Sequence, residues 1–136
     1  MAKKPLRALV ADDIAVARDL LKTMLRTLEV PEILDASNGI DAVAEFRRSR
    51  PDIVFLDIRM PGKDGLQALQ EILAIDPAAF VVMDSAESTA DNVRTAVESG
   101  ARGFMVKPYN MDKVRDILDK YAAYRASLKP ASENEG

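Results

Sequence analysis

Polar side chains that could take part in chemistry follow several short apolar runs of the sequence. Asp12 and Asp13 come after the first run, Asp57 ends the run IVFL, and Ser85 and Lys107 follow two later runs. Carboxylates held about 4 Å apart would repel one another by about 4 kcal/mol per pair at an effective dielectric constant near 20. A cluster of the three Asp side chains therefore needs cations, and Lys107 supplies one.

The remaining compensating charge points to a hard divalent cation. Carboxylate oxygens, a carbonyl oxygen and retained waters suit Mg²⁺, or Mn²⁺ in its place, whereas Zn²⁺ prefers His or Cys. The chain has neither His nor Cys, which also excludes Ser-His and Cys-His catalysis, a phosphohistidine carrier and disulfides. A metal ion and an ammonium beside Asp57 would form an electropositive pocket suited to a phosphoryl group.

Apolar runs of five or six residues alternate with longer segments of helical period, a pattern typical of βα units around a parallel sheet. The expected strands are Leu6–Ala11, Glu32–Ala36, Asp52–Asp57, Phe80–Asp84 and Arg102–Val106. The expected helices are Ile14–Leu28, Gly39–Ser49, Gly65–Ile75, Thr89–Ser99 and Met111–Leu128. Right-handed crossovers then predict an α/β fold, a doubly wound (βα)5 three-layer sandwich. Its functional crevice lies outside the carboxyl ends of the strands, where the polar residues would meet.

Length and composition predict one domain over residues 1–128 and a flexible tail, KPASENEG, after Leu128. With 19 basic and 22 acidic residues and a net charge of −3, the chain has no overall attraction to nucleic acid. Neither a signal peptide nor a membrane-spanning run is recognisable, so we expect a cytoplasmic protein that does not bind membranes.

These motifs, in this order, resemble the receiver domain of bacterial two-component response regulators over roughly residues 6–126. The resemblance rests on Asp12-Asp13, on Asp57 followed by RMPGKDG, on Ser85-Ala86 and on Lys107-Pro108. It implies a five-stranded parallel sheet of flavodoxin-like order 2-1-3-4-5, as in single-domain chemotaxis regulators. It also implies a cis peptide bond between Lys107 and Pro108.

The resemblance implies a phosphorylation-activated signalling switch and not an enzyme with a separate substrate. Asp57 would accept a phosphoryl group from a sensor histidine kinase or a phosphotransfer protein, while Lys107 and Ser85 contact phosphoryl oxygens. Phe104 occupies the position of the family's switch aromatic residue. A downstream protein effector would read the change at the face made by the fourth helix, fifth strand and fifth helix.

The same resemblance implies a set of metal ligands and a pair of tuning residues. Asp13 and Asp57 would bind Mg²⁺ directly, Asp12 would reach it through water, and the backbone carbonyl of Arg59 would add an oxygen. Arg59 and Glu87 occupy positions that tune the lifetime of the acyl phosphate. Because their charges are opposite, we expect them to pair across the mouth of the pocket.

Simpler structural roles exist for several of these residues. Asp12 or Asp13 is expected to cap the following helix as well as bind metal, and Asp64 with Gly65 is expected to form a helix-starting turn without chemistry. Asp84 departs from the family, which usually has an apolar residue there. Its carboxylate needs a partner, either a basic residue of the fourth or fifth helix or a second cation.

Two other classes of function compete with the phosphorylated switch. A pseudo-receiver that binds partners without phosphorylation would lack a site residue, and none is missing. An aspartate-dependent phosphatase would need an Asp where Arg59 stands, and a cap domain. The sequence leaves open the kinase, the effector, and whether the protein is a monomer or a phosphorylation-dependent dimer.

Overall fold

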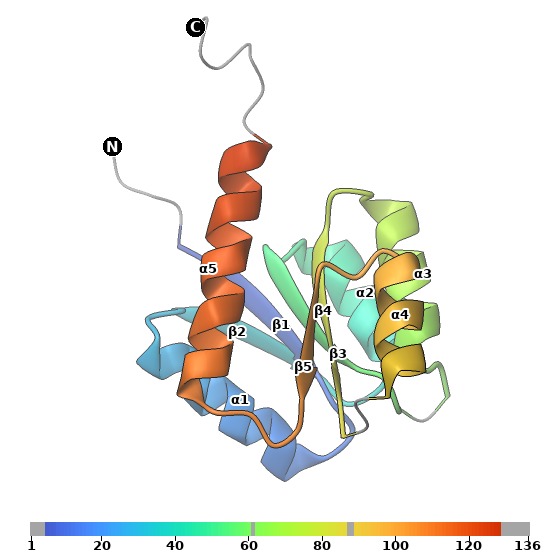
Figure 1. Cartoon of the computed structure of the whole chain (residues 1–136), viewed down its shortest axis with the longest axis horizontal. Coiled ribbons are helices and arrows are strands. Elements are labelled where there is room, and N and C mark those ends of the chain that lie inside the picture. The colour runs from blue at the N-terminus through green and yellow to red at the C-terminus, as the bar shows by residue number, and fades with distance from the viewer. Residues whose placement is uncertain (1–4, 61, 87–88, 129–136) are drawn as a thin grey trace, which may run out of the picture.

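Parallel strands form one sheet in the order β2-β1-β3-β4-β5 in the computed structural model, which describes residues 5–60, 62–86 and 89–128 (Figure 1). The strands are β1 (Arg7–Ala11), β2 (Glu32–Ala36), β3 (Ile53–Asp57), β4 (Phe80–Ser85) and β5 (Gly103–Val106). All neighbouring strands in this sheet run parallel. The predicted doubly wound fold and its strand order are confirmed.

A helix follows each of these strands. The helices are α1 (Ala15–Thr27), α2 (Gly39–Ser49), α3 (Gly65–Ile75), α4 (Ala90–Glu98) and α5 (Met111–Ser127). The predicted ends of strands and helices differ from the observed ones by one residue at most. The described helices include none that is long and apolar enough to cross a bilayer. The tail expected over residues 129–136 lies outside the described residues.

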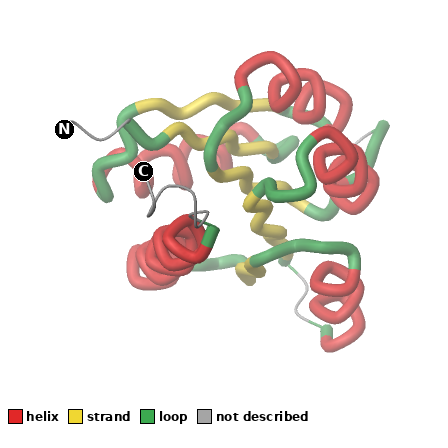
Figure 2. Tube along the Cα trace, turned by 90° about the horizontal axis from the view of Figure 1, so that it is seen from above, coloured by secondary structure: helices red, strands yellow, loops and turns green. Residues whose placement is uncertain are grey.

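The helices cover the sheet as two layers, with α1 and α5 on one face and α2, α3 and α4 on the other (Figures 1 and 2). Successive residues of β3 alternate between the two cores: Ile53 and Phe55 pack on the α1/α5 side, and Val54 and Leu56 on the opposite side. This central strand is buried throughout, as its apolar sequence predicts. The alternation places Asp57 on the α1/α5 side at the carboxyl end of the strand.

Four helices begin with a side-chain cap. Asn38, Asp64, Thr89 and Asn110 each accept a hydrogen bond from a backbone N–H in the first turn of the helix that follows. Asp64 forms a capping box with Gln67, which confirms its expected structural role. These caps fix the helix starts next to the strand ends.

Helix α1 starts differently, and the prediction that Asp12 or Asp13 caps it is wrong. Its N-cap residue is Ile14, which provides no side-chain hydrogen bond. The Oδ1 atom of Asp12 accepts from the N–H of Ile14 at 2.9 Å, while Oδ2 accepts from Lys107. Asp12 is therefore committed to the strand edge and its lysine instead of to the helix.

Candidate functional site

The carboxyl ends of β1, β3 and β5 bring Asp12, Asp57 and Lys107 into direct contact. The Nζ atom of Lys107 donates to Oδ2 of Asp12 at 2.8 Å and to Oδ2 of Asp57 at 3.2 Å. The two carboxylates are almost completely buried, with exposures of 2% for Asp12 and 6% for Asp57. Three residues distant in the sequence thus form one buried ionic cluster.

Asp13 adds a third carboxylate to Asp12 and Asp57. One oxygen of each lies within 4.8 Å of the others, close enough to ligate a single cation, and Asp13 is exposed to solvent. Oxygen atoms alone form this donor set, which fits Mg²⁺ or another hard dication. The expected acidic metal-binding group is therefore assembled in the fold.

Arg18 of α1 supports this edge, a role that the sequence did not reveal. Its Nη1 donates to the backbone carbonyl of Asp12 at 2.7 Å, and its Nε lies 3.6 Å from Asp35 at the end of β2. This side chain ties the β1 end to α1 and to the neighbouring strand. Its position one helical turn after Ile14 is the sequence signal that would have suggested it.

Burial and mutual repulsion shape the protonation of the cluster. Burial raises the pKa of Asp57, Lys107 opposes that rise, and Asp12 adds to it. Burial alone would lower the pKa of Lys107, but its hydrogen bond to Asp12 and the charges of Asp84 and Asp57 hold that pKa above its usual range. Lys107 therefore stays charged, and its positive charge favours the ionised form of the neighbouring carboxylates.

Asp84 is the fourth carboxylate of the cluster. It pairs in register with Asp57 across β3 and β4, is 2% exposed, and has its Oδ1 3.6 Å from Nζ of Lys107. Its partner is thus the lysine at the end of β5, and not a basic residue of α4 or α5. Burial raises the pKa of Asp84 to about 7, against the opposing effect of Lys107.

Tyr109 is a further neighbour of the cluster that the sequence did not single out. It lies just after Pro108, which follows Lys107 through a cis peptide bond, as expected. Burial and the negative charges of Asp84, Asp12 and Asp57 raise the pKa of its phenol. The phenol therefore stays neutral beside the carboxylates.

Ser85 and Phe104 belong to the opposite side of the sheet. Ser85 is buried at the end of β4 and pairs in register with Val106, which shares a strand face with Phe104. Phe104 is half-buried and packs against the core covered by α2, α3 and α4. The residues expected to form the switch therefore occupy one face, next to α4.

Arg59 borders the cluster two residues after Asp57. Its backbone N–H donates to Oδ1 of Asp57 at 3.2 Å, and the residue lines the same pocket as Asp57. The expected partner Glu87 lies outside the described residues. Both the metal-binding role of the Arg59 carbonyl and the Arg59–Glu87 pair stay predictions.

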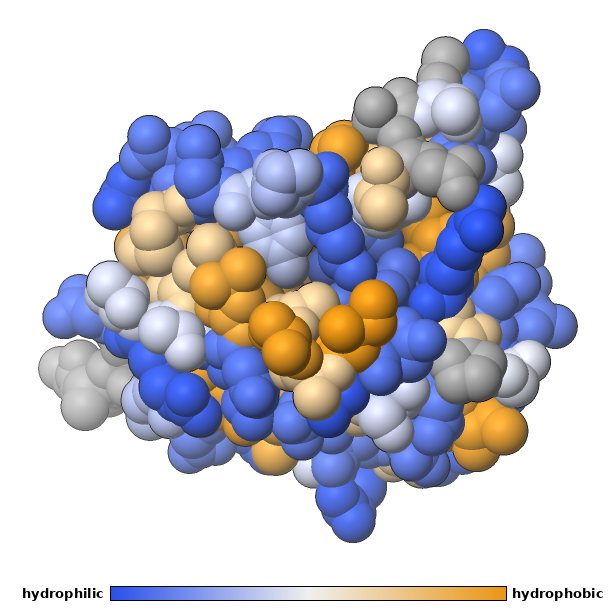
Figure 3. All heavy atoms as spheres, turned by 90° about the horizontal axis from the view of Figure 1, so that it is seen from below, coloured by the Kyte–Doolittle hydropathy of each residue, from blue (hydrophilic) through white to orange (hydrophobic). Residues whose placement is uncertain are grey.

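A pocket of about 290 Å³ opens over the cluster and gives solvent access to Asp57, Ser85 and Lys107. Figure 3 looks onto the edge of the molecule where the strands end, and shows apolar surface in the middle of a polar rim. Ile14, which is 56% exposed, lines this pocket. The site is thus open to a small ion or phosphodonor.

A family model described as the response regulator receiver domain matches residues 8–119. The chain belongs to this family. The receiver domain is 40% identical over 117 residues to the chemotaxis protein CheY of Listeria monocytogenes, a match that covers 86% of this chain and 98% of that protein.

Solved structures agree with this membership. A CheX–CheY complex with BeF3 and Mg²⁺ from Borrelia burgdorferi matches with a TM-score of 0.81 and 32% identity, covering 84% of this chain and 87% of that chain. A response regulator receiver domain protein from Clostridium thermocellum matches with a TM-score of 0.85 and 25% identity, covering 91% and 99%. Receiver domains are signalling switches and not classical enzymes. Membership in this family is consistent with phosphorylation-dependent two-component signalling.

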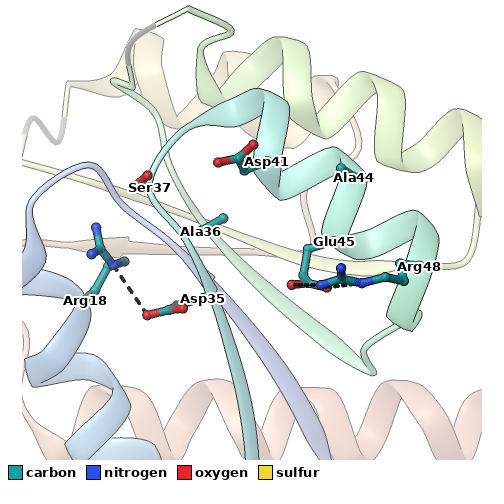
Figure 4. A pocket seen from close by; sticks show the side chains of 8 residues that line it. All are labelled: Arg18, Asp35, Ala36, Ser37, Asp41, Ala44, Glu45 and Arg48. Carbon is teal, nitrogen blue, oxygen red and sulfur yellow. Dashed lines mark hydrogen bonds and ion pairs between the residues drawn. The ribbon is translucent and has the colours of Figure 1, made fainter.

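The receiver domain has a second hollow of about 470 Å³ beside the edge strand β2 (Figure 4). Four of its charged side chains already form ion pairs, Arg18 with Asp35 and Arg48 with Glu45, and the fifth, Asp41, accepts a hydrogen bond from the side chain of Asn38. This hollow holds no cluster like the one at the strand ends, and we assign it no chemistry.

Proposed function

We propose that the protein is a phosphorylation-activated switch of a two-component phosphorelay, with Asp57 as its phosphoacceptor. The observation that carries this proposal is that Asp57 contacts the Lys107 ammonium and lies close enough to Asp12 and Asp13 to share a cation with them. A buried acceptor in contact with a lysine, beside a site for a dication, suits transfer of a charged phosphoryl group.

In the proposed reaction, a carboxylate oxygen of Asp57 attacks phosphorus of the donor. The new P–O bond gives an aspartyl phosphate, and the P–N bond of a kinase phosphohistidine, or the P–O bond of acetyl phosphate, breaks with its electron pair on the leaving group. The Lys107 ammonium lies 3.2 Å from Asp57 and can turn to a phosphoryl oxygen. The Ser85 hydroxyl lines the same pocket and can donate to another oxygen.

Asp13 and Asp57 would hold Mg²⁺ directly, with Asp12 reaching it through water and the Arg59 carbonyl completing the protein ligands. When bound, the ion supplies positive charge that offsets the negative charge of the phosphoryl oxygens. An ion held there would compete with the hydrogen bonds that Lys107 donates to Asp12 and Asp57, so the carboxylates would exchange one cation for another.

The proposed readout lies on the α4, β5 and α5 face. A hollow of about 310 Å³ there is lined by Phe104, Val106, Pro108 and Tyr109 and by Asn110 and Lys113 at the start of α5. Phosphorylation would draw Ser85 and Lys107 toward the phosphoryl group and vacate space for the Phe104 ring. A downstream protein that binds this face would detect the change. The kinase and this effector would meet the protein in the cytoplasm.

The test is intact-mass analysis after incubation with acetyl phosphate and Mg²⁺. The wild type should gain one labile phosphoryl group, and Asp57→Asn should gain none. Asp64→Asn, which alters a carboxylate in the α3 cap, serves as the matched control and should be phosphorylated normally. An adduct of equal yield on Asp57→Asn, or no adduct on the wild type, would refute the assignment.

A further inference from the structure

Asp84 is a buried acid in a strand that is otherwise apolar up to its last residue, with the sequence FVVMDS. Its Oδ1 has no hydrogen-bond partner within the described part of the chain, although the side chain is 2% exposed. Burying a carboxylate costs several kcal/mol unless a cation compensates it. An apolar side chain could be buried at this position without that cost, which suggests that the carboxylate has a further role.

The compensating cation is the ammonium of Lys107. An ammonium has three N–H donors, and this one faces three carboxylates: Asp12 at 2.8 Å, Asp57 at 3.2 Å and Asp84 at 3.6 Å. The first two distances are hydrogen bonds, whereas the third is an ion pair longer than a hydrogen bond. Lys107 therefore lies closer to the two residues proposed to bind metal than to Asp84.

Asp84 differs from Asp12 and Asp57 because it does not belong to the group of carboxylates that could ligate a metal ion. Asp12, Asp13 and Asp57 offer oxygens within 4.8 Å of one another, and Asp84 is not part of that group. An ion bound there would compete with Lys107 for Asp12 and Asp57. Asp84 would remain available, and a shift of a few tenths of an ångström would give Lys107 a hydrogen bond to it.

We propose that Asp84 is a positioning residue, which receives the Lys107 ammonium when metal occupies Asp12, Asp13 and Asp57 and competes with the phosphoryl group for that ammonium. This inference rests on the proposed function, since it assigns regulation to the same site. It gives Asp84 opposite effects on two ligands. The carboxylate favours Mg²⁺ by offering Lys107 another partner, and it disfavours a phosphoryl group by retaining the lysine.

The test compares binding of Mg²⁺, and then of BeF3⁻ at saturating Mg²⁺, to the wild type, Asp84→Asn and Asp84→Val by calorimetry. Both variants should bind Mg²⁺ about three- to tenfold more weakly and BeF3⁻ about three- to tenfold more tightly than the wild type, the size of one modest charge–charge interaction. Asp119→Asn removes an exposed carboxylate of α5 and controls for net charge. It should change neither affinity.

A double-mutant cycle with Lys107→Met tests whether Asp84 acts through the lysine. In that background, Asp84→Asn should leave the affinity for Mg²⁺ unchanged. The same weakening in both backgrounds would mean that Asp84 acts as a general negative charge, and would overturn the proposal. Weaker binding of both ligands, or no change in either, would also overturn it.

The wild type and the Asp84 variants together distinguish a wrong role for Asp84 from a wrong proposed function. If the wild type takes up Mg²⁺ and gains the phosphoryl adduct while the Asp84 variants match it, only the role of Asp84 is wrong. If the wild type binds no Mg²⁺ and gains no adduct, the proposed function itself is wrong. Thermal unfolding of each variant establishes that it is folded, and Asp84→Val provides a folded alternative should Asp84→Asn be unstable.

Discussion

Gly65 lies directly against the backbone of Asp57. A Cβ atom at Gly65 would stand 2.2 Å from the carbonyl oxygen of Asp57 and 2.8 Å from the Cα of Ile58, and the Gly65 N–H donates to the Ile58 carbonyl at 2.8 Å. The first residue of α3 is therefore packed onto the strand end that presents the acceptor. Gly65 has no chemical role, but it determines where Asp57 sits.

We predict that Gly65→Ala destabilises the fold by about 2 kcal/mol, because the added methyl group must displace backbone. It should also weaken Mg²⁺ binding, since the displaced backbone carries Asp57. Urea unfolding and calorimetry measure the two effects. Gly62→Ala is the control: its φ of +77° strains an alanine, but the nearest atom, Ile40 Cδ1, is 3.7 Å away. Gly62→Ala should lose stability and keep its Mg²⁺ affinity, and an unchanged affinity in Gly65→Ala would contradict the prediction.

Removal of the shared ammonium gives a second prediction. Lys107→Met leaves Asp12, Asp57 and Asp84 without their cation, so the metal-free protein should lose about 3 kcal/mol of stability at pH 8. Mg²⁺ should bind more tightly than in the wild type, because no ammonium competes for Asp12 and Asp57. Chemical unfolding with EDTA or with Mg²⁺ measures both effects.

Lys22→Met is the matched control for that experiment. Lys22 pairs with Asp35, whose side chain is 42% exposed, so its loss should cost less than about 1 kcal/mol and leave Mg²⁺ binding alone. Weaker Mg²⁺ binding in Lys107→Met would contradict the view that lysine and metal compete.

The sequence predicted most of this site because strand ends in a parallel α/β sheet share one edge. The apolar run before Asp57 and the turn residues after it were enough to place that carboxylate, and the same reasoning placed Asp12 and Lys107. The helix starts followed from short polar side chains, as at Asp64. These features are local, so a single chain reveals them.

The partner of Asp84 could not be predicted, because it depends on the register of three strands. The pairing of Asp84 with Asp57 and with Met105 sets the distance to Lys107, and register is a tertiary property. The predicted N-cap at Asp12 failed for a related reason. A distant lysine competes for the carboxylate, and no local pattern reports it.

The raised pKa of Asp84 predicts how stability depends on pH in the metal-free protein. Its pKa is about 7 in the fold and 3.8 ordinarily, so between about pH 4 and pH 7 the folded state binds more protons than the unfolded state. The contribution of this group to the stability of the fold is therefore fully present below about pH 4 and is lost as the pH rises through about 7. The difference in free energy of unfolding between Asp84→Asn and the wild type should therefore be about 2–4 kcal/mol more in favour of the variant at pH 8 than at pH 5.

Urea unfolding in EDTA at the two pH values checks this difference. Burial also raises the pKa of Asp57, which adds a slope of the same sign that the Asp84→Asn variant retains. The comparison between wild type and variant isolates Asp84 from the other carboxylates. A variant whose advantage is equal at pH 5 and pH 8 would show that Asp84 does not titrate in this window.

The lifetime of the aspartyl phosphate should depend on Arg59. Arg59 lines the pocket over Asp57, and we expect its side chain to pair with Glu87 and impede the attacking water. Arg59→Ala should then shorten the half-life of the acyl phosphate severalfold, and Glu87→Ala should shorten it by a similar factor with no further loss in the double variant. Release of the phosphoryl group followed by intact mass gives the half-lives. Arg94→Ala, which removes an exposed arginine paired with Asp91 on α4, should match the wild type. Equal half-lives for wild type and Arg59→Ala would show that the pair does not impede the attacking water. An ion pair between solvated side chains has little energetic consequence.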